Sequence, residues 1–201
     1  MSETQAINKD LINRFEAFAC EGMRNAVNGF STMLGEKLQT SAPTFRQVPI
    51  REISELLGGP ETEAVGIYLN SEGKVSGQFM LVIPLERSLE MADLILGQEP
   101  GTTKVLGTLE RSALGEVGNV TASFFLNTFS SMTGIDARPS PPAVMVDMVG
   151  AIMDIIVATC GGVSDHVLLM QTKFLLKDRS IETSFWVIPD PHTLEVLLVE
   201  G

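Results

Sequence analysis

The sequence predicts an α/β protein made of two similar halves that share one antiparallel-rich sheet. Two observations support this fold class: short segments recur in order along the chain, and each half shows the same succession of helical and strand patterns. The recurring pairs are FSTMLG at 30–35 and FSSMTG at 129–134, Pro43 and Pro142, Val82–Pro84 and Val187–Pro189, and Leu89-Glu90 and Leu194-Glu195. The first two pairs are 99 residues apart and the last two are 105 apart. We therefore expect one internal duplication with a small net insertion in the second copy.

The sequence pattern of the first half predicts a helix at each end, with a short strand, a short helix and a hairpin between them. The predicted elements are a helix at 7–34, a strand at 44–48, a short helix at 50–57, strands at 64–69 and 75–83, and a helix at 86–96. The first helix is amphipathic and stops before Gly35, and Gly58-Gly59 ends the short helix, as glycine commonly does. Asn70–Gly73 has the composition of a turn and joins the two strands.

The second half repeats this order. Its predicted elements are a helix at 108–133, a strand at 144–148, a short helix at 150–159, strands at 167–176 and 181–188 around a turn at 177–180, and an end near Val199. We expect a single domain, 1–201, of two repeats at about 7–97 and 107–200, with 98–104 as the linker because it contains Pro100 and Gly101. The halves should merge into one sheet with helices on both faces.

Composition excludes several classes of function. The net charge is −11 and no cluster of Lys and Arg occurs, which argues against binding to nucleic acid. The N-terminus lacks an apolar signal segment, and Asp147 and Asp154 interrupt the longest apolar stretch, so we expect a cytoplasmic protein that does not enter a membrane. Cys20 and Cys160 match no metal motif and predict small buried side chains.

Catalytic apparatus is sparse. His166 and His192 have no second metal ligand at a suitable spacing, and the sequence contains no nucleophile elbow, P-loop or dinucleotide glycine pattern. An unrelated hydrolase therefore has no nucleophile–base pair to support it. We expect no cofactor that belongs to this chain.

One polar stripe stands out in the second long helix. At about 100° per residue, Ser112, Glu116, Asn119 and Ser123 fall within about 60° of one another. The apolar residues beside the stripe are Ala113, Val117, Val120 and Phe124, which predict the core-facing side. An asparagine donates and accepts hydrogen bonds and can position a water molecule, and a glutamate can pair with a cation on a partner. The alternative is that the stripe is an ordinary solvated face.

The stripe resembles the signature of the CheC, CheX and FliY phosphatase family: Asp or Ser, three residues, Glu, two residues, Asn, twenty-two residues, Pro. Ser112, Glu116, Asn119 and Pro142 match it at all three spacings. The resemblance implies a pseudo-twofold CheC-like sandwich, with two long helices and shorter helices packed on the sheet. The two-copy layout favours CheC within the family.

The resemblance also implies a mechanism and a partner. Family members dock the motif helix on phosphorylated CheY, whose aspartyl phosphate and Mg²⁺ belong to CheY. By this likeness Asn119 orients the attacking water and Glu116 binds a lysine of CheY, and both are the expected catalytic residues. Ser112 and Pro142 are expected to shape the motif.

The first copy departs from the family pattern. The positions 99 residues before the motif are Asn13, Ala17, Cys20 and Pro43, so the glutamate and the asparagine are missing. The nearby Glu21 and Asn25 are out of register. We expect one functional site, in the second half. The alternative is a non-catalytic interaction module, because FliM keeps the fold without the motif and CheC proteins can bind CheD.

Overall fold

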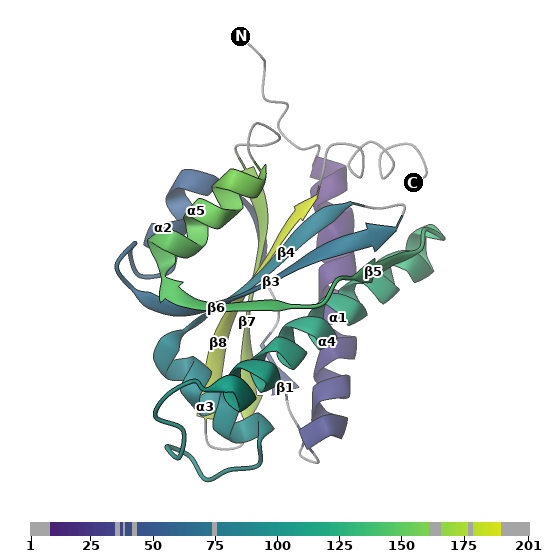
Figure 1. Cartoon of the computed structure of the whole chain (residues 1–201). Helices are drawn as coiled ribbons and strands as arrows, with labels where there is room; N and C mark the ends of the chain where they lie inside the picture. Colours follow the sequence, from purple (N-terminus) through teal and green to yellow (C-terminus); the bar gives the residue numbers. More distant parts are fainter. Residues whose placement is uncertain are drawn as a thin grey trace.

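One antiparallel sheet organises the chain in the computed structural model, which describes residues 9–34, 37, 39–41, 44–73, 76–160, 166–176 and 179–189 (Figure 1). The elements of the first half are α1 (Lys9–Leu34), β1 (Gln39–Thr40), β2 (Thr44–Pro49), the 3-10 turn η1 (Ile50–Glu52), α2 (Ile53–Leu56), β3 (Glu63–Gly73), β4 (Gly77–Pro84) and α3 (Leu85–Ile95). Those of the second half are α4 (Thr108–Thr133), β5 (Ala137–Pro139), β6 (Ala143–Met148), α5 (Val149–Cys160), β7 (His166–Leu176) and β8 (Arg179–Pro189).

Strands from the two halves meet at the centre of the sheet. Over the described residues the sheet has eight strands in the order β1-β7-β8-β4-β3-β5, with β2 also paired to β7 and β6 to β3. Every pair is antiparallel, and β4 of the first half pairs with β8 of the second from Gly77↔Pro189 to Val82↔Ser184. The predicted antiparallel-rich sheet is confirmed.

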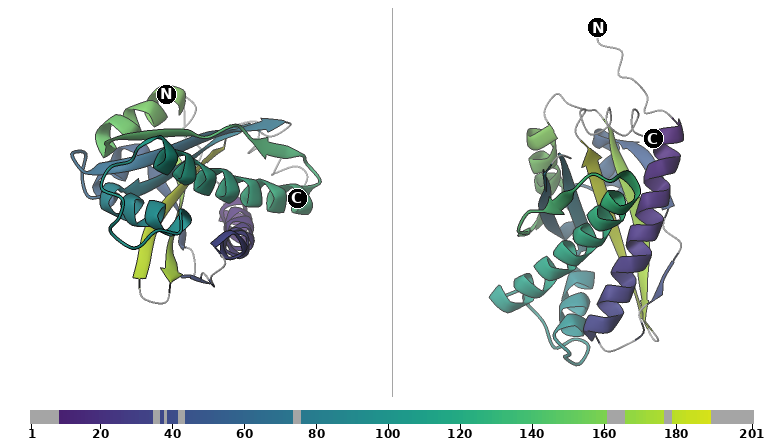
Figure 2. Two further views of the ribbon diagram at one scale, coloured as in Figure 1. Left: turned by 60° about the horizontal axis from the view of Figure 1, so that its bottom comes forward. Right: turned by 90° about the vertical axis from the view of Figure 1, so that its right-hand side faces the viewer.

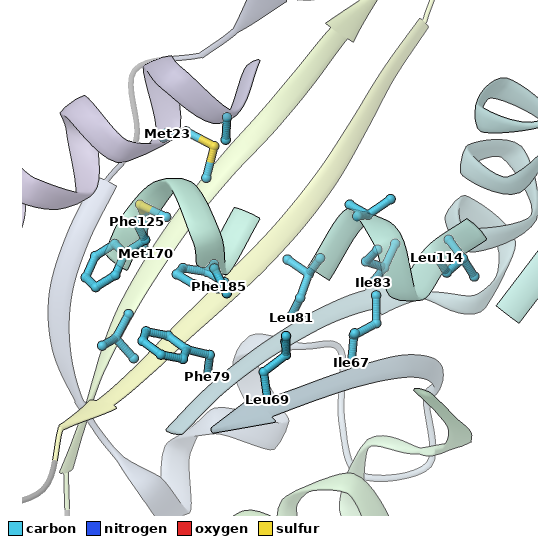
Figure 3. Packing of buried hydrophobic residues seen from close by; sticks show 14 of the residues in the cluster. Met23, Ile67, Leu69, Phe79, Leu81, Ile83, Leu114, Phe125, Met170 and Phe185 are labelled. Carbon is cyan, nitrogen blue, oxygen red and sulfur yellow. The ribbon is translucent and has the colours of Figure 1, made fainter. Parts of the chain in front are cut away.

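Helices cover both faces of this sheet. The right-hand view of Figure 2 shows the sheet between α5 on one side and α1 on the other. The core under α1, α3 and α4 includes Met91 of α3. Figure 3 shows other members of this core: Met23, Leu114, Phe125 and the strand residues Ile67, Leu81 and Phe185. The core under α2 and α5 includes Ile53, Ile152, Met80 and Trp186. The predicted arrangement of long and short helices around the sheet is confirmed.

The bounds of the elements follow the spacing of the recurring segments. The described part of α1, Lys9–Leu34, and α4, Thr108–Thr133, lie 99 positions apart in the sequence. The strands β2 and β6 end at Pro49 and Met148, again 99 apart. The last residues of β4 and β8, Pro84 and Pro189, are 105 apart. The division into two repeats remains a prediction.

The expected turn at Asn70–Gly73 is wrong, because β3 runs through it. Its far end has partners on both sides: Ser71 pairs with Gly77 of β4 and with Pro139 of β5, and Gly73 pairs with Ala137. The backbone hydrogen bonds supplied by β5 keep these residues extended in spite of their turn-like composition. The second predicted turn, 177–180, is also too long, since Arg179 already belongs to β8.

Smaller differences concern the short helices and what lies outside the description. The predicted helix at 50–57 is divided into η1 and the single turn of α2, and α5 extends one residue beyond its prediction at each end. Pro43, His192 and the predicted end near Val199 lie outside the described residues.

The predicted linker at 98–104 is held by one buried carboxylate. Asp93 of α3 has no exposed surface, and its Oδ2 accepts hydrogen bonds from the backbone N–H groups of Gly101 (2.7 Å) and Thr102 (3.1 Å). Its Oδ1 accepts one from the N–H of Thr103 at 2.7 Å. Burial by itself raises the pKa of Asp93, but the hydrogen bonds from Thr103, Gly101 and Thr102 favour the charged carboxylate and leave the pKa below its ordinary value. Asp93 therefore fixes the position of the linker that leads into α4.

We predict that Asp93→Asn lowers the free energy of unfolding by about 2 kcal/mol near pH 7, because the amide turns a donor toward backbone donors. Since the folded-state pKa lies below the unfolded value of about 3.9, the contribution of the carboxylate is complete above that value. It is lost as the pH falls through the folded-state pKa. Denaturant unfolding from pH 7 to pH 3 should show the two proteins converging in acid. The exposed Asp154→Asn is the control, and an equal loss for both variants would contradict the prediction.

Candidate functional site

The predicted motif residues form an outward-facing polar ridge on α4, which we define as Ser112, Glu116, Asn119 and Ser123. Ser112 and Glu116 are exposed, and Asn119 and Ser123 are half-buried. The fully buried side of the helix includes Leu114, Gly118, Thr121 and Phe125. These residues lie at about 180–240° from Ser112 around the helix, so the ridge points away from the core.

This buried side differs from the expected one. Of the four apolar residues predicted to face the core, Val117 is buried, but Ala113, Val120 and Phe124 are half-buried and flank the ridge. The hydrophobic pattern indicated the wrong face because the inner face of the helix carries Gly115, Gly118 and Thr121. These residues contribute little to a pattern of hydrophobic residues.

Two glycines allow α4 to lie unusually close to the sheet. A Cβ atom on Gly118 would be 2.5 Å from Cγ2 of Ile67 in β3, far inside van der Waals contact. A Cβ atom on Gly115 would be 3.3 Å from both Cγ of Pro142 and Cγ2 of Val144 in β6. Pro142, the last residue of the motif, therefore packs against the helix turn that carries Glu116. Gly115 and Gly118 flank Glu116 and Val117, so their contacts with the sheet fix the distance between the sheet and the polar ridge.

Aromatic packing fixes the middle of α4. The ring of Phe125 contacts Phe79 of β4 and Phe185 of β8 edge-on, with centroid distances of 5.6 and 5.9 Å. Phe79 and Phe185 stack on each other at 5.7 Å. On the other side of α4, Gly22 of α1 lies so close that a Cβ atom there would be 3.0 Å from the backbone of Phe125. These contacts hold α4 between α1 and the central pair of strands (Figures 1 and 3).

Glu116 and Asn119 contact each other on the ridge. Nδ2 of Asn119 donates a hydrogen bond to Oε2 of Glu116 at 3.4 Å. In the part of the chain that is described, no ion pair involves Glu116 and no other hydrogen bond engages either side chain. The amide oxygen and the second amide hydrogen of Asn119 are thus available to a ligand. The pair offers one negative charge and one positioned amide, but no nucleophile and no strong base.

The positions 99 residues earlier offer no such pair. Asn13 and Ala17 are exposed on α1, and Cys20 is half-buried. Burial, with a further contribution from Glu16, raises the pKa of the Cys20 thiol, so the thiol stays protonated near neutrality. Asn25, already out of register, instead donates from Nδ2 to Oγ1 of Thr128 in α4 at 3.4 Å. Its role is to join the two long helices.

The described residues give little support to histidine or metal chemistry. His166 begins β7 and pairs in register with Pro49 of β2. Among the described residues no three His, Cys, Asp or Glu side chains come together as a metal site would require. Within the same residues no helix is both long and apolar enough to span a bilayer.

The layered fold is similar to that of CheC-like proteins, and the helix with the predicted motif lies on it. The CheC-like family model matches residues 109–146, which run from the first turn of α4 through the end of its close contact with β6. The resemblance seen in the sequence is confirmed: over this segment the chain is similar to the CheC-like family.

Individual relatives show the same similarity. The chain is 22% identical over 182 residues to the CheY-P phosphatase CheC of Bacillus subtilis, covering 89% of this chain and 87% of that protein. Its fold is similar to that of FliY from Thermotoga maritima, with a TM-score of 0.76, 18% identity and 96% of both chains covered. It is also similar to CheX in a CheX–CheY–BeF₃–Mg²⁺ complex from Borrelia burgdorferi, with a TM-score of 0.54, 18% identity, and 92% of this chain and 99% of that one covered.

The sequence reasoning missed the residues that support the ridge. Gly115 and Gly118 were visible as two glycines inside a helix, where each costs about 1 kcal/mol relative to alanine and so signals a close contact. Asp93 carried no comparable signal, because its partners are backbone groups of the linker.

We predict that Gly118→Ala lowers the free energy of unfolding by about 1 kcal/mol or more, because a clash with buried Ile67 outweighs the gain in helix propensity. The exposed Asn127→Ala on the same helix is the control and should leave stability unchanged or raise it. Denaturant unfolding measures both. Stabilisation by Gly118→Ala would show that α4 is not packed as closely as described.

Proposed function

We propose that this protein accelerates the hydrolysis of the phosphoaspartate on a CheY-like response regulator, with a single site at Glu116 and Asn119 in the second repeat. The observation that carries the proposal is the Glu116–Asn119 pair. It lies on an outward-facing ridge of α4 within the segment that the CheC-like family model matches. A site without its own nucleophile or metal suits a protein that completes an active site located on a partner.

Asn119 has the chemistry for positioning water. Its amide oxygen accepts a hydrogen bond from a water molecule, and an amide N–H can donate to a phosphoryl oxygen. The water oxygen then bonds to phosphorus in line with the breaking bond to the aspartate oxygen. The electron pair of that bond stays on the regulator's carboxylate, and the protons of the water end on phosphate and solvent. The regulator supplies Mg²⁺, which neutralises phosphoryl charge when bound, and this chain supplies position.

Glu116 has two tasks in this proposal. Its exposed carboxylate can pair with a lysine of the regulator, and its Oε2 holds the amide of Asn119 at 3.4 Å. Ser112 is exposed one turn before Glu116, and Pro142 packs under the same turn beside Gly115. We assign them a supporting role in shaping the site.

The relatives support the choice of partner. One relative, CheC of Bacillus subtilis, is a CheY-P phosphatase, and a structural relative is bound to CheY with BeF₃ and Mg²⁺. An interaction module that binds the regulator without catalysis is the second candidate, favoured by the absence of a Glu–Asn pair at Ala17 and Cys20. Binding to CheD, a cytoplasmic location and the two-repeat origin of the chain remain predictions.

We expect Asn119→Ala to reduce accelerated phosphate release about a hundredfold or more, toward the spontaneous rate, while binding of the regulator is retained. The test follows inorganic phosphate released from a phosphorylated CheY-type regulator with Mg²⁺. Cys20→Ala, 99 residues earlier on α1, is the matched control and should behave as wild type. Wild-type protein that binds the regulator without accelerating release would favour the interaction module.

We expect Glu116→Gln to raise KM for the phosphorylated regulator several-fold and to weaken its dependence on salt, because an interfacial ion pair is lost. The change in kcat should be smaller than for Asn119→Ala, since Gln can still accept a hydrogen bond from Asn119. Steady-state release at 50 and 300 mM salt measures both effects. An unchanged salt dependence of KM would remove the proposed ion pair.

A further inference from the structure

Two exposed apolar side chains stand immediately before the polar ridge. Val105, in the linker, is 78% exposed, and Leu109, in the first turn of α4, is 60% exposed. Among the described residues they are the most exposed large hydrophobic side chains. Leu109, Ser112 and Glu116 follow one another at helical spacings of three and four, so the apolar contact and the ridge form one continuous surface.

The exposure of these side chains is built into the fold. Leu106, between them, is only 6% exposed and packs into the core under α1 and α4. Nε of Arg111 donates to the carbonyl oxygen of Leu106 at 3.1 Å, and Asp93 binds the backbone N–H groups two to four residues before Val105. With Leu106 anchored inward, Val105 and Leu109 are held outward. Such a fixed apolar pair has little entropy left to lose when a partner covers it.

The position of the pair suits the partner of the ridge. At about 1.5 Å per residue, Leu109 lies about 10 Å along α4 from Glu116 and about 15 Å from Asn119. A specific protein interface covers about 800 Å² on each side, so a partner that reaches Asn119 also covers Leu109. The unpaired carboxylate of Glu116 lies beside an apolar contact. The partner surface that complements this arrangement presents a lysine next to an apolar patch.

We propose that Val105 and Leu109 form an apolar docking contact for the phosphorylated response regulator. This inference rests on the proposed function and adds to it the part of the surface that supplies affinity. The regulator places its phosphoaspartate at Asn119, a lysine at Glu116 and an apolar patch over Leu109 and Val105. The apolar contact then supplies affinity for the regulator, and the amide of Asn119 positions the attacking water.

A matched control exists on the opposite side of the molecule. Val157 of α5 is 50% exposed, comparable to Leu109, but α5 covers the other face of the sheet (Figures 1 and 2). A regulator docked on α4 does not reach it. Exposed apolar residues can therefore be made polar at either place without disturbing the core.

The experiment compares the full-length wild type with Leu109→Gln, Val105→Gln/Leu109→Gln and Val157→Gln. Phosphate release from the phosphorylated regulator with Mg²⁺ gives kcat and KM, and titration with the regulator carrying beryllofluoride gives Kd. We expect KM and Kd to rise about tenfold for Leu109→Gln and further for the double variant, the effect of one well-packed anchor. The kcat at saturation and the values for Val157→Gln should match the wild type.

The outcomes separate this inference from the proposed function. Wild-type acceleration with unchanged KM and Kd in both α4 variants would overturn the docking contact and leave the phosphatase in place. A fall in kcat at unchanged KM would overturn it too. Wild-type binding without acceleration, weakened by Leu109→Gln and not by Val157→Gln, would remove the phosphatase and support the contact. No binding of the regulator by the wild type would overturn both.

Discussion

The close approach of α4 to the sheet at Gly115 and Gly118 is the contact on which the candidate site depends. A helix with two interior glycines gives up about 2 kcal/mol of intrinsic stability relative to alanine. In return the backbone of α4 reaches Ile67 of β3 at a distance that a side chain on Gly118 would forbid, and it packs tightly at Gly115 against Pro142 and against Val144 of β6. Rotation of the helix about its axis would drive the neighbouring side chains Leu114 and Val117 out of the core. Glu116 and Asn119 consequently have one outward direction.

The two halves of the chain contribute jointly to this placement. The first half supplies Ile67 beneath the glycines, Phe79 against Phe125, and the Asp93 carboxylate that fixes the linker before α4. The second half supplies α4 itself and Phe185 of β8, which stacks on Phe79. Because β4 and β8 are hydrogen-bonded neighbours, the site cannot form in one half alone. A site assembled from backbone approach and aromatic stacking is rigid, and rigidity is what the proposed positioning of a water molecule by Asn119 requires.

The sequence predicted the features that have local signals. The ends of α4 were predicted residue for residue because Gly134 stops the helix, and the ridge was predicted because polar side chains at spacings of three and four share a helix face. The continuation of β3 through Asn70–Gly73 was missed because pairing with β5 overrides local turn propensity. The buried face of α4 was predicted wrongly because the glycines and the threonine on it add little to a hydrophobic pattern. The half-buried Val120 and Phe124 dominate that pattern instead. Contacts between distant segments were invisible to every local rule.

The first half differs from the second in more than the two missing side chains of the predicted motif. The positions 99 residues before Gly115 and Gly118 are Glu16 and Ala19, so α1 lacks the glycines that bring α4 close to the sheet. The glycines that α1 does have, Gly22 and Gly29, face Phe125 and Phe124 of α4 instead. The glycines of α1 therefore bring its backbone close to α4, whereas the glycines of α4 bring its backbone close to the sheet. Placing Glu at Ala17 and Asn at Cys20 would restore the side chains without the surface that holds them, since the first helix supports the second rather than duplicating it.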